Sequence, residues 1–85
     1  MNGDILLEAH VLLNGDRQDD YGHPAVSLVR IAAMWSACLG HAVTGKDVGL
    51  LMALFKIGRE AHSHKLDNLV DAAGYIGLAA DVEAV

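Results

Sequence analysis

Hydrophobic residues recur every three or four positions along most of this chain, which is the period of an amphipathic helix. No run alternates apolar and polar residues over more than a few positions, so strands are not expected. The pattern predicts an all-α fold, in one compact domain that covers the whole chain. We expect four helices, at about 4–14, 25–39, 47–62 and 64–83, with a polar loop at 15–24.

Short signals mark where these helices are expected to begin and end. Pro24 suits the first turn of the second helix, because a helix needs no N–H at that position. Gly40 is expected to end this helix, and Thr44 followed by Asp47 predicts a capping box for the third. Ser63 is interpreted as the cap that begins the fourth helix.

The apolar residues of each helix predict the side that it buries. The second helix is apolar almost all round, which predicts burial on every side, inside the chain or between subunits. In the third helix, Gly49 and Ala53 lie on a strip of small residues that lets another helix approach. The main buried sides are expected at Leu50, Leu51, Leu54, Phe55 and Ile57 of the third helix, and at Leu66, Leu69, Val70, Ala73, Ile76 and Ala80 of the fourth.

Composition and charge add expectations about partners. Hydrophobic residues make up 53% of the 85, and aromatic residues only 5%, so most of the apolar content is aliphatic. This is more apolar surface than one small core needs, and we therefore expect a homo-oligomer. The formal net charge is −5 with six Lys and Arg, which argues against binding of duplex nucleic acid.

The sequence also bears on the cellular compartment. The longest stretch without a charged residue, 31–45, is too short to span a membrane, and residues 1–4 lack the basic start of a signal peptide. Cys38 is the single cysteine, so no internal disulfide forms, as in proteins of a reducing compartment. We expect a cytoplasmic protein without a membrane segment.

Two acidic residues of the fourth helix are the first candidates for chemistry. Asp67 and Asp71 lie one helical turn apart, where they repel each other unless a positive charge lies between them. That charge could be Mg²⁺, which prefers carboxylate and phosphate oxygens. It could equally be Lys56 or Arg59 of the preceding helix, in a structural ion pair. The sequence leaves both alternatives open.

Lys56, Arg59 and Glu60 lie near the end of the third helix. Two cations and a carboxylate in this arrangement could bind a phosphate together with a metal ion. The alternative is that the cations only complement the helix dipole, as basic residues commonly do at helix C-termini.

The polar loop at 15–24 is the third candidate. Arg17 could bind an anion with its planar guanidinium group, and Tyr21 could stack on a base. The alternative is a surface loop in which Asp20 and its acidic neighbours form Asx turns.

Three short motifs carry a resemblance to a known family. They are R-x-x-D-Y-G at 17–22, K-x-x-R at 56–59 and D-x-x-x-D-x-x-x-Y at 67–75. Together they resemble a small phage and prophage family of unknown function, over about the whole chain. They are also similar to the nucleotide-modification-associated domains of phage genomes. The resemblance implies the cytoplasm of a host cell as the location and a nucleotide-like phosphate ligand, bound by Arg17, Asp20, Tyr21, Lys56, Arg59 and Tyr75.

A more distant resemblance implies a reaction. The all-α nucleotide pyrophosphohydrolases of the MazG and dUTPase type place an E-x-x-E helix before an E-x-x-D helix, whose acids bind Mg²⁺. The resemblance implies that Glu60, Asp67 and Asp71 are metal ligands and that the two Asp residues are catalytic. The chain departs from that family because Lys56 stands where an acid is expected. Its Asp residues are also four positions apart rather than three.

Three hypotheses of function follow. The first is a Mg²⁺-dependent nucleotide (pyro)phosphohydrolase of MazG-like type. The second is a non-catalytic phage module that binds or sequesters a nucleotide or signalling nucleotide against host defence. The third is a helical module that binds another protein through its apolar surface.

Overall fold

The structure is a computed structural model that describes residues 2–14 and 23–83. Within these residues the chain forms four helices and no strand, which confirms the all-α fold. Each helix begins and ends within two residues of the range that the sequence predicts. The helices are α1 (Asn2–Asn14), α3 (Pro24–Leu39), α4 (Gly45–His62) and α5 (Leu66–Glu83).

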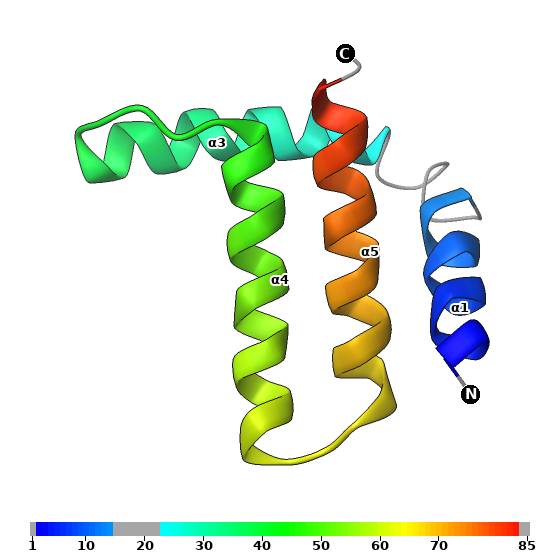
Figure 1. Cartoon of the computed structure of the whole chain (residues 1–85). Coiled ribbons are helices and arrows are strands. Elements are labelled where there is room, and N and C mark those ends of the chain that lie inside the picture. The colour runs from blue at the N-terminus through cyan, green and yellow to red at the C-terminus, as the bar shows by residue number, and fades with distance from the viewer. Residues whose placement is uncertain (1, 15–22, 84–85) are drawn as a thin grey trace.

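α4 and α5 form an antiparallel pair, and the other two helices pack on this pair (Figure 1). α1 lies along α5 on the side away from α4. α3 runs across the N-terminal end of α4 and the C-terminal end of α5. Its own C-terminal half extends beyond α4, so that α3 and α4 together have the outline of an L.

The helix ends follow the expected signals with one exception. The capping box is present, since Thr44 Oγ1 accepts from the Asp47 N–H at 3.1 Å and Asp47 Oδ2 accepts from the Thr44 N–H at 3.0 Å. Gly40 ends α3 in the left-handed conformation that favours glycine, with φ 77°. The interpretation of Ser63 is wrong: its N–H donates to the Arg59 carbonyl at 3.1 Å, so it ends α4 instead of beginning α5.

The core lies where α3, α4 and α5 meet. Small residues let these helices approach, because a Cβ on Gly45 would lie only 3.1 Å from the side chains of Val29 and Val82. The buried centre of the core consists of Leu28, Ala32 and Val48, and the partly buried side chains around it are Ile31, Trp35, Val43, Met52, Leu78 and Val82.

The prediction for the main buried side of α4 is wrong. The side that faces α3 and α5 is the strip of small residues, where Gly45, Gly49 and Ala53 are buried. A Cβ on Gly49 would lie 3.0 Å from Ala79 Cβ and 3.1 Å from the Tyr75 carbonyl oxygen, so α4 and α5 are in close contact. Close contact along a whole helix gains many dispersion interactions, which large side chains at these positions would prevent. The predicted residues Leu50, Leu51, Leu54, Phe55 and Ile57 are instead 41–60% exposed.

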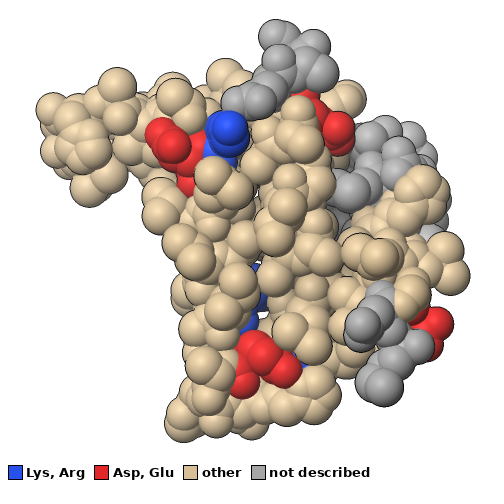
Figure 2. All heavy atoms as spheres, in the orientation of Figure 1, with Lys and Arg blue, Asp and Glu red and all other residues tan. Residues whose placement is uncertain are grey.

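α3 and α5 also expose residues that the sequence predicts to be buried. On α5, Val70 is buried as expected, but Leu66 and Ile76 are about half exposed. α3 buries only Ala25, Leu28 and Ala32, whereas Val26, Val29, Met34 and Leu39 are 46–66% exposed. Figure 2 shows the result, since the outer part of α3 and the middle of α4 carry no charged side chains in that view. No described helix has both the length and the hydropathy that a membrane span requires.

Candidate functional site

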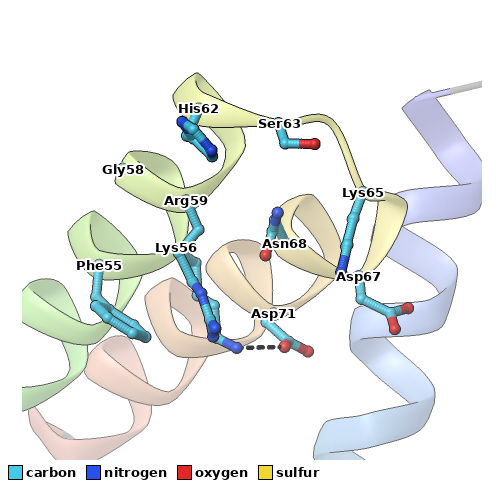
Figure 3. Close-up of a pocket in the computed structure, with 10 residues that line it drawn as sticks. All are labelled: Phe55, Lys56, Gly58, Arg59, His62, Ser63, Lys65, Asp67, Asn68 and Asp71. Atoms are coloured by element: carbon cyan, nitrogen blue, oxygen red, sulfur yellow. Dashed lines mark ion pairs between the residues drawn. The ribbon is translucent and has the colours of Figure 1, made fainter.

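A hollow of about 770 Å³ lies at the end of the α4–α5 pair, where the chain passes from one helix to the other. Three of its lining residues, Lys56, Arg59 and Lys65, are half of the six Lys and Arg residues in the chain. This gathering of cations on an acidic chain favours an anionic ligand. The lining residues are Phe55, Lys56, Gly58, Arg59, His62, Ser63, Lys65, Asp67, Asn68 and Asp71 (Figure 3).

The last turns of α4 place two of these cations beside an aromatic ring. The Arg59 guanidinium lies 5.1 Å from the centroid of the Phe55 ring, and Lys56 Nζ lies 6.0 Å from it. Both distances are within the range of cation–π attraction. The Phe55 side chain is 52% exposed, so much of the ring remains accessible to a ligand.

An ion pair connects the two helices inside the hollow. Lys56 Nζ lies 3.0 Å from Asp71 Oδ2, and the two side chains are only 17% and 29% exposed (Figure 3). For Asp71, the structure therefore shows the ion pair that the sequence left open as an alternative to a metal ion. Asp67 also lines the hollow, but its carboxylate is exposed and points away from this pair (Figure 3).

The Glu60 carboxylate is bonded to the turn beside the hollow. Its Oε1 accepts from the Lys65 backbone N–H at 2.9 Å and from the Asn68 side-chain amide at 3.4 Å. Its Oε2 contacts Nδ1 of His64, which must be the donor because an ionised carboxylate only accepts. The bond from His64, followed by that from Lys65, holds the pKa of Glu60 below its ordinary value.

The three predicted metal ligands do not converge on one point. Asp71 is paired with Lys56, Asp67 points away, and Glu60 is bonded to the turn. In the part of the chain that the structure describes, no three His, Cys, Asp or Glu residues could hold a metal ion together. A Mg²⁺ ion in this hollow would therefore need phosphate oxygens of a bound ligand in addition to one or two carboxylates.

The other predicted ligand residues fall into two groups. Tyr75 is one turn beyond Asp71 on α5, where it is partly buried and does not line the hollow. Arg17, Asp20 and Tyr21 lie outside the described residues.

Sequence reasoning missed three residues that matter for the site. The pattern predicts Phe55 on the buried side of the third helix and Lys65 inside the last helix, without a role for either in the site. Asn68 is only 8% exposed and shares the side of α5 that carries the buried Ala72 and Ala79. The sequence signal for Asn68 was its position among small apolar residues on one side of the helix. A buried amide there requires a hydrogen-bonding partner.

Comparison with known proteins shows relatives in phages. The chain is 38% identical over 78 residues to the Gene 55 protein of Mycobacterium phage D29, a match that covers 91% of this chain and 52% of that protein. It is 40% identical over 76 residues to the Gene 55 protein of Mycobacterium phage L5, with 87% and 49% covered. The chain thus spans about half the length of these curated relatives. No solved structure matches it significantly.

The family itself is shown by a match over nearly the whole chain. Residues 4–83 match the family described as "Domain of unknown function (DUF6378)". This match and the phage relatives confirm the expected membership of a phage-associated family of unknown function. Neither the family description nor the names of the relatives state an activity, so the resemblance to MazG-type enzymes stays a prediction. The chain belongs to the DUF6378 family.

Proposed function

We propose that the hollow at the α4–α5 turn binds the phosphates of a nucleotide or a nucleotide-like ligand. The observation that carries this proposal is the gathering of half of the Lys and Arg residues, in a chain of net charge −5, around one hollow. Arg59 and Lys65 would donate charge-assisted hydrogen bonds to phosphate oxygens, which are stronger than bonds between neutral groups. The exposed ring of Phe55 offers a surface on which a base can stack.

The acidic residues of the hollow indicate the form in which the ligand binds. Asp67 and Asp71 would repel a bare polyphosphate, because all of these groups are negative. A Mg²⁺–nucleotide complex reduces this repulsion, and Mg²⁺ commonly takes one or two carboxylates together with phosphate oxygens. We therefore expect a nucleoside triphosphate to bind more tightly with Mg²⁺ than without it.

Calorimetric titration of the chain with a nucleoside triphosphate and Mg²⁺ tests the proposal. Arg59→Ala and Lys65→Ala should each weaken binding about tenfold or more, the usual effect of losing a hydrogen bond to a charged group. Arg30→Ala is the matched control, because it removes the same charge from an exposed position on α3 outside the hollow. Equal losses in all three variants would show that binding follows net charge and would contradict the proposal.

Hydrolysis of the nucleotide is a second candidate, favoured by the presence of two carboxylates in the same hollow as the cations. Asp71→Asn separates the two candidates. If Asp71 serves a Mg²⁺-dependent reaction, the variant loses turnover. If the site only binds, the variant releases Lys56 from its ion pair and retains or increases its affinity for the nucleotide.

Phosphorus NMR of a mixture of nucleoside triphosphates with Mg²⁺ provides the measurement. New pyrophosphate or orthophosphate that disappears with Asp71→Asn would support hydrolysis. Resonances that shift or broaden without a new product would support binding alone. Because the relatives are phage proteins, a module that only binds would act in the host cytoplasm and withhold a nucleotide or signalling nucleotide from host defence. Cyclic nucleotides are then the next ligands to compare.

A further inference from the structure

One side of α4 faces away from the other helices and is apolar over most of its length. We call it the outward face. Since a helix turns about 100° per residue, Leu50, Leu54 and Ile57 form one ridge of this face. Leu51 and Phe55 lie beside that ridge. All five side chains are 41–60% exposed, which is unusual for large apolar residues placed so close together.

The overhanging half of α3 meets the outward face of α4 at a corner. This half of α3 extends past α4, and it exposes Met34 by 66% and Leu39 by 59% (Figure 1). The space-filling view shows no charged side chain on the outer end of this half, while charged side chains lie where it meets the start of α4 (Figure 2). Away from that junction, both arms of the L are apolar.

We propose that this corner takes a second copy of the chain, with the two α4 helices antiparallel across a two-fold axis. Two identical L-shaped surfaces fit together when one is rotated by 180° relative to the other. The overhanging half of α3 in each copy then lies over the C-terminal end of the partner's α4. The interface would be self-complementary, as in most homodimers. Leu50, Leu54 and Ile57 of the outward face, together with Leu39 of α3, would supply its apolar centre.

The dipole of α4 favours the antiparallel direction. A helix is partly positive at its N-terminal end and partly negative at its C-terminal end. An antiparallel pair places each positive end beside the partner's negative end, whereas a parallel pair would bring like ends together. The charged side chains of the end turns add little, because Lys46 accompanies Asp47 and Glu60 accompanies Arg59.

Gly58 leaves room for a neighbouring helix. Glycine inside a helix is unfavourable relative to alanine. A Cβ on Gly58 would meet no described atom within 4 Å, so packing among the described residues does not explain the glycine. In an antiparallel pair that crosses near Leu54, Gly58 lies opposite the partner's Leu50 and leaves room for it. Phe55 and Gly58 also line the hollow, so the second copy would border the proposed ligand site.

Sedimentation equilibrium over a range of protein concentrations tests the proposal. The unmodified chain should have twice its own mass of 9.0 kDa. Leu54→Glu should return the mass to 9.0 kDa with an unchanged circular dichroism spectrum, because Leu54 is 60% exposed in the single chain. The control is Leu7→Glu, which places the same charge on a residue that is 61% exposed on α1 and should leave the dimer intact. A mass of 9.0 kDa for the unmodified chain, or equal dissociation by both variants, would overturn the proposal.

A disulfide test decides the direction of the helices. It uses chains in which the exposed Cys38 is replaced by Ser, so that only introduced thiols react. Leu50→Cys chains mixed with Gly58→Cys chains should form mixed disulfides on mild oxidation. Disulfides only between identical chains would show a parallel arrangement and contradict the antiparallel one.

Discussion

The surroundings of Glu60 in the structure determine which groups its carboxylate bonds to. Its place beside Lys56 and Arg59 in the sequence suggested a metal ligand. In the structure both oxygens bond to groups that follow in the chain: the His64 ring, the Lys65 N–H and the Asn68 amide. These bonds fix the turn that forms one wall of the hollow.

The first prediction concerns the pH dependence that Glu60 gives to stability. Because folding lowers the pKa of Glu60 from its ordinary value of 4.5, its bonds stabilise the fold fully above that pH. The stabilisation is lost as the pH falls through the lower pKa of the folded state. Glu60→Gln should therefore reduce the free energy of unfolding at neutral pH. The difference from the unmodified chain should shrink on acidification below 4.5, as measured by urea unfolding followed by circular dichroism.

A difference that persists undiminished in acid would show that the shape of Glu60, rather than its charge, stabilises the turn. Asp47 has a pKa lowered in the same direction by its bonds to Thr44, and is present in both proteins. Its contribution therefore cancels in the comparison.

The second prediction concerns the Lys56–Asp71 ion pair. Lys56→Met, Asp71→Asn and the double variant form a cycle whose coupling free energy should be about 1 kcal/mol, since the pair is partly shielded from water. Added salt should reduce the coupling, because part of it is screened. Urea unfolding of the four proteins measures it. A coupling of zero would mean that the two charges do not pair in solution.

At the scale of elements, the contact between α4 and α5 depends on positions without a large side chain. Gly49 lies where the α4 backbone approaches Ala79 and the carbonyl oxygen of Tyr75. Gly74 provides a contrast within the same helix pair, because a Cβ there would meet no described atom within 4 Å.

The third prediction compares the same substitution at these two glycines. Gly74→Ala should raise the free energy of unfolding by about 0.5–1 kcal/mol, which is the usual preference for alanine inside a helix. Gly49→Ala should lose this gain or become destabilising, because its Cβ would lie 3.0 Å from Ala79 Cβ and 3.1 Å from a backbone oxygen. Thermal unfolding of the two variants provides the comparison. Equal stabilisation by both would contradict the close contact of the helices.

At the scale of the whole molecule, the described part of the chain exposes many large apolar side chains, and its core buries few. The core has Val48 as its largest fully buried side chain, while the outward face of α4 and the overhang of α3 expose leucine, isoleucine, methionine and phenylalanine. Association would bury this surface and thereby add to the stability of a small domain.

The fourth prediction follows from this link between association and stability. The midpoint of thermal unfolding should rise with protein concentration, because a dimer that dissociates on unfolding obeys mass action. Leu54→Glu should remove the concentration dependence and lower the midpoint. A midpoint that is independent of concentration in the unmodified chain would indicate that it unfolds as a monomer.

The candidate site could be predicted from the sequence only in part. The sequence offered Lys56 or Arg59 as a partner of Asp71 in place of a metal ion, and the structure shows the pair with Lys56. The contributions of Phe55, Lys65 and Asn68 were not foreseen, since they depend on how the turn after α4 directs the chain. The bonds of Glu60 could not be foreseen either, because they join the end of one helix to the start of the next.

The sequence by itself determined the helices and most of their ends. These features depend on contacts within four residues, such as the capping box of Thr44 and the left-handed Gly40. Only the tertiary structure decided which sides of the helices are buried. Hydrophobic periodicity records where apolar residues lie, but Gly49 and Ala53 permit a closer approach of α5 than leucines would. How closely α4 and α5 approach depends on the surfaces of both helices, so the sequence of one helix alone does not determine it.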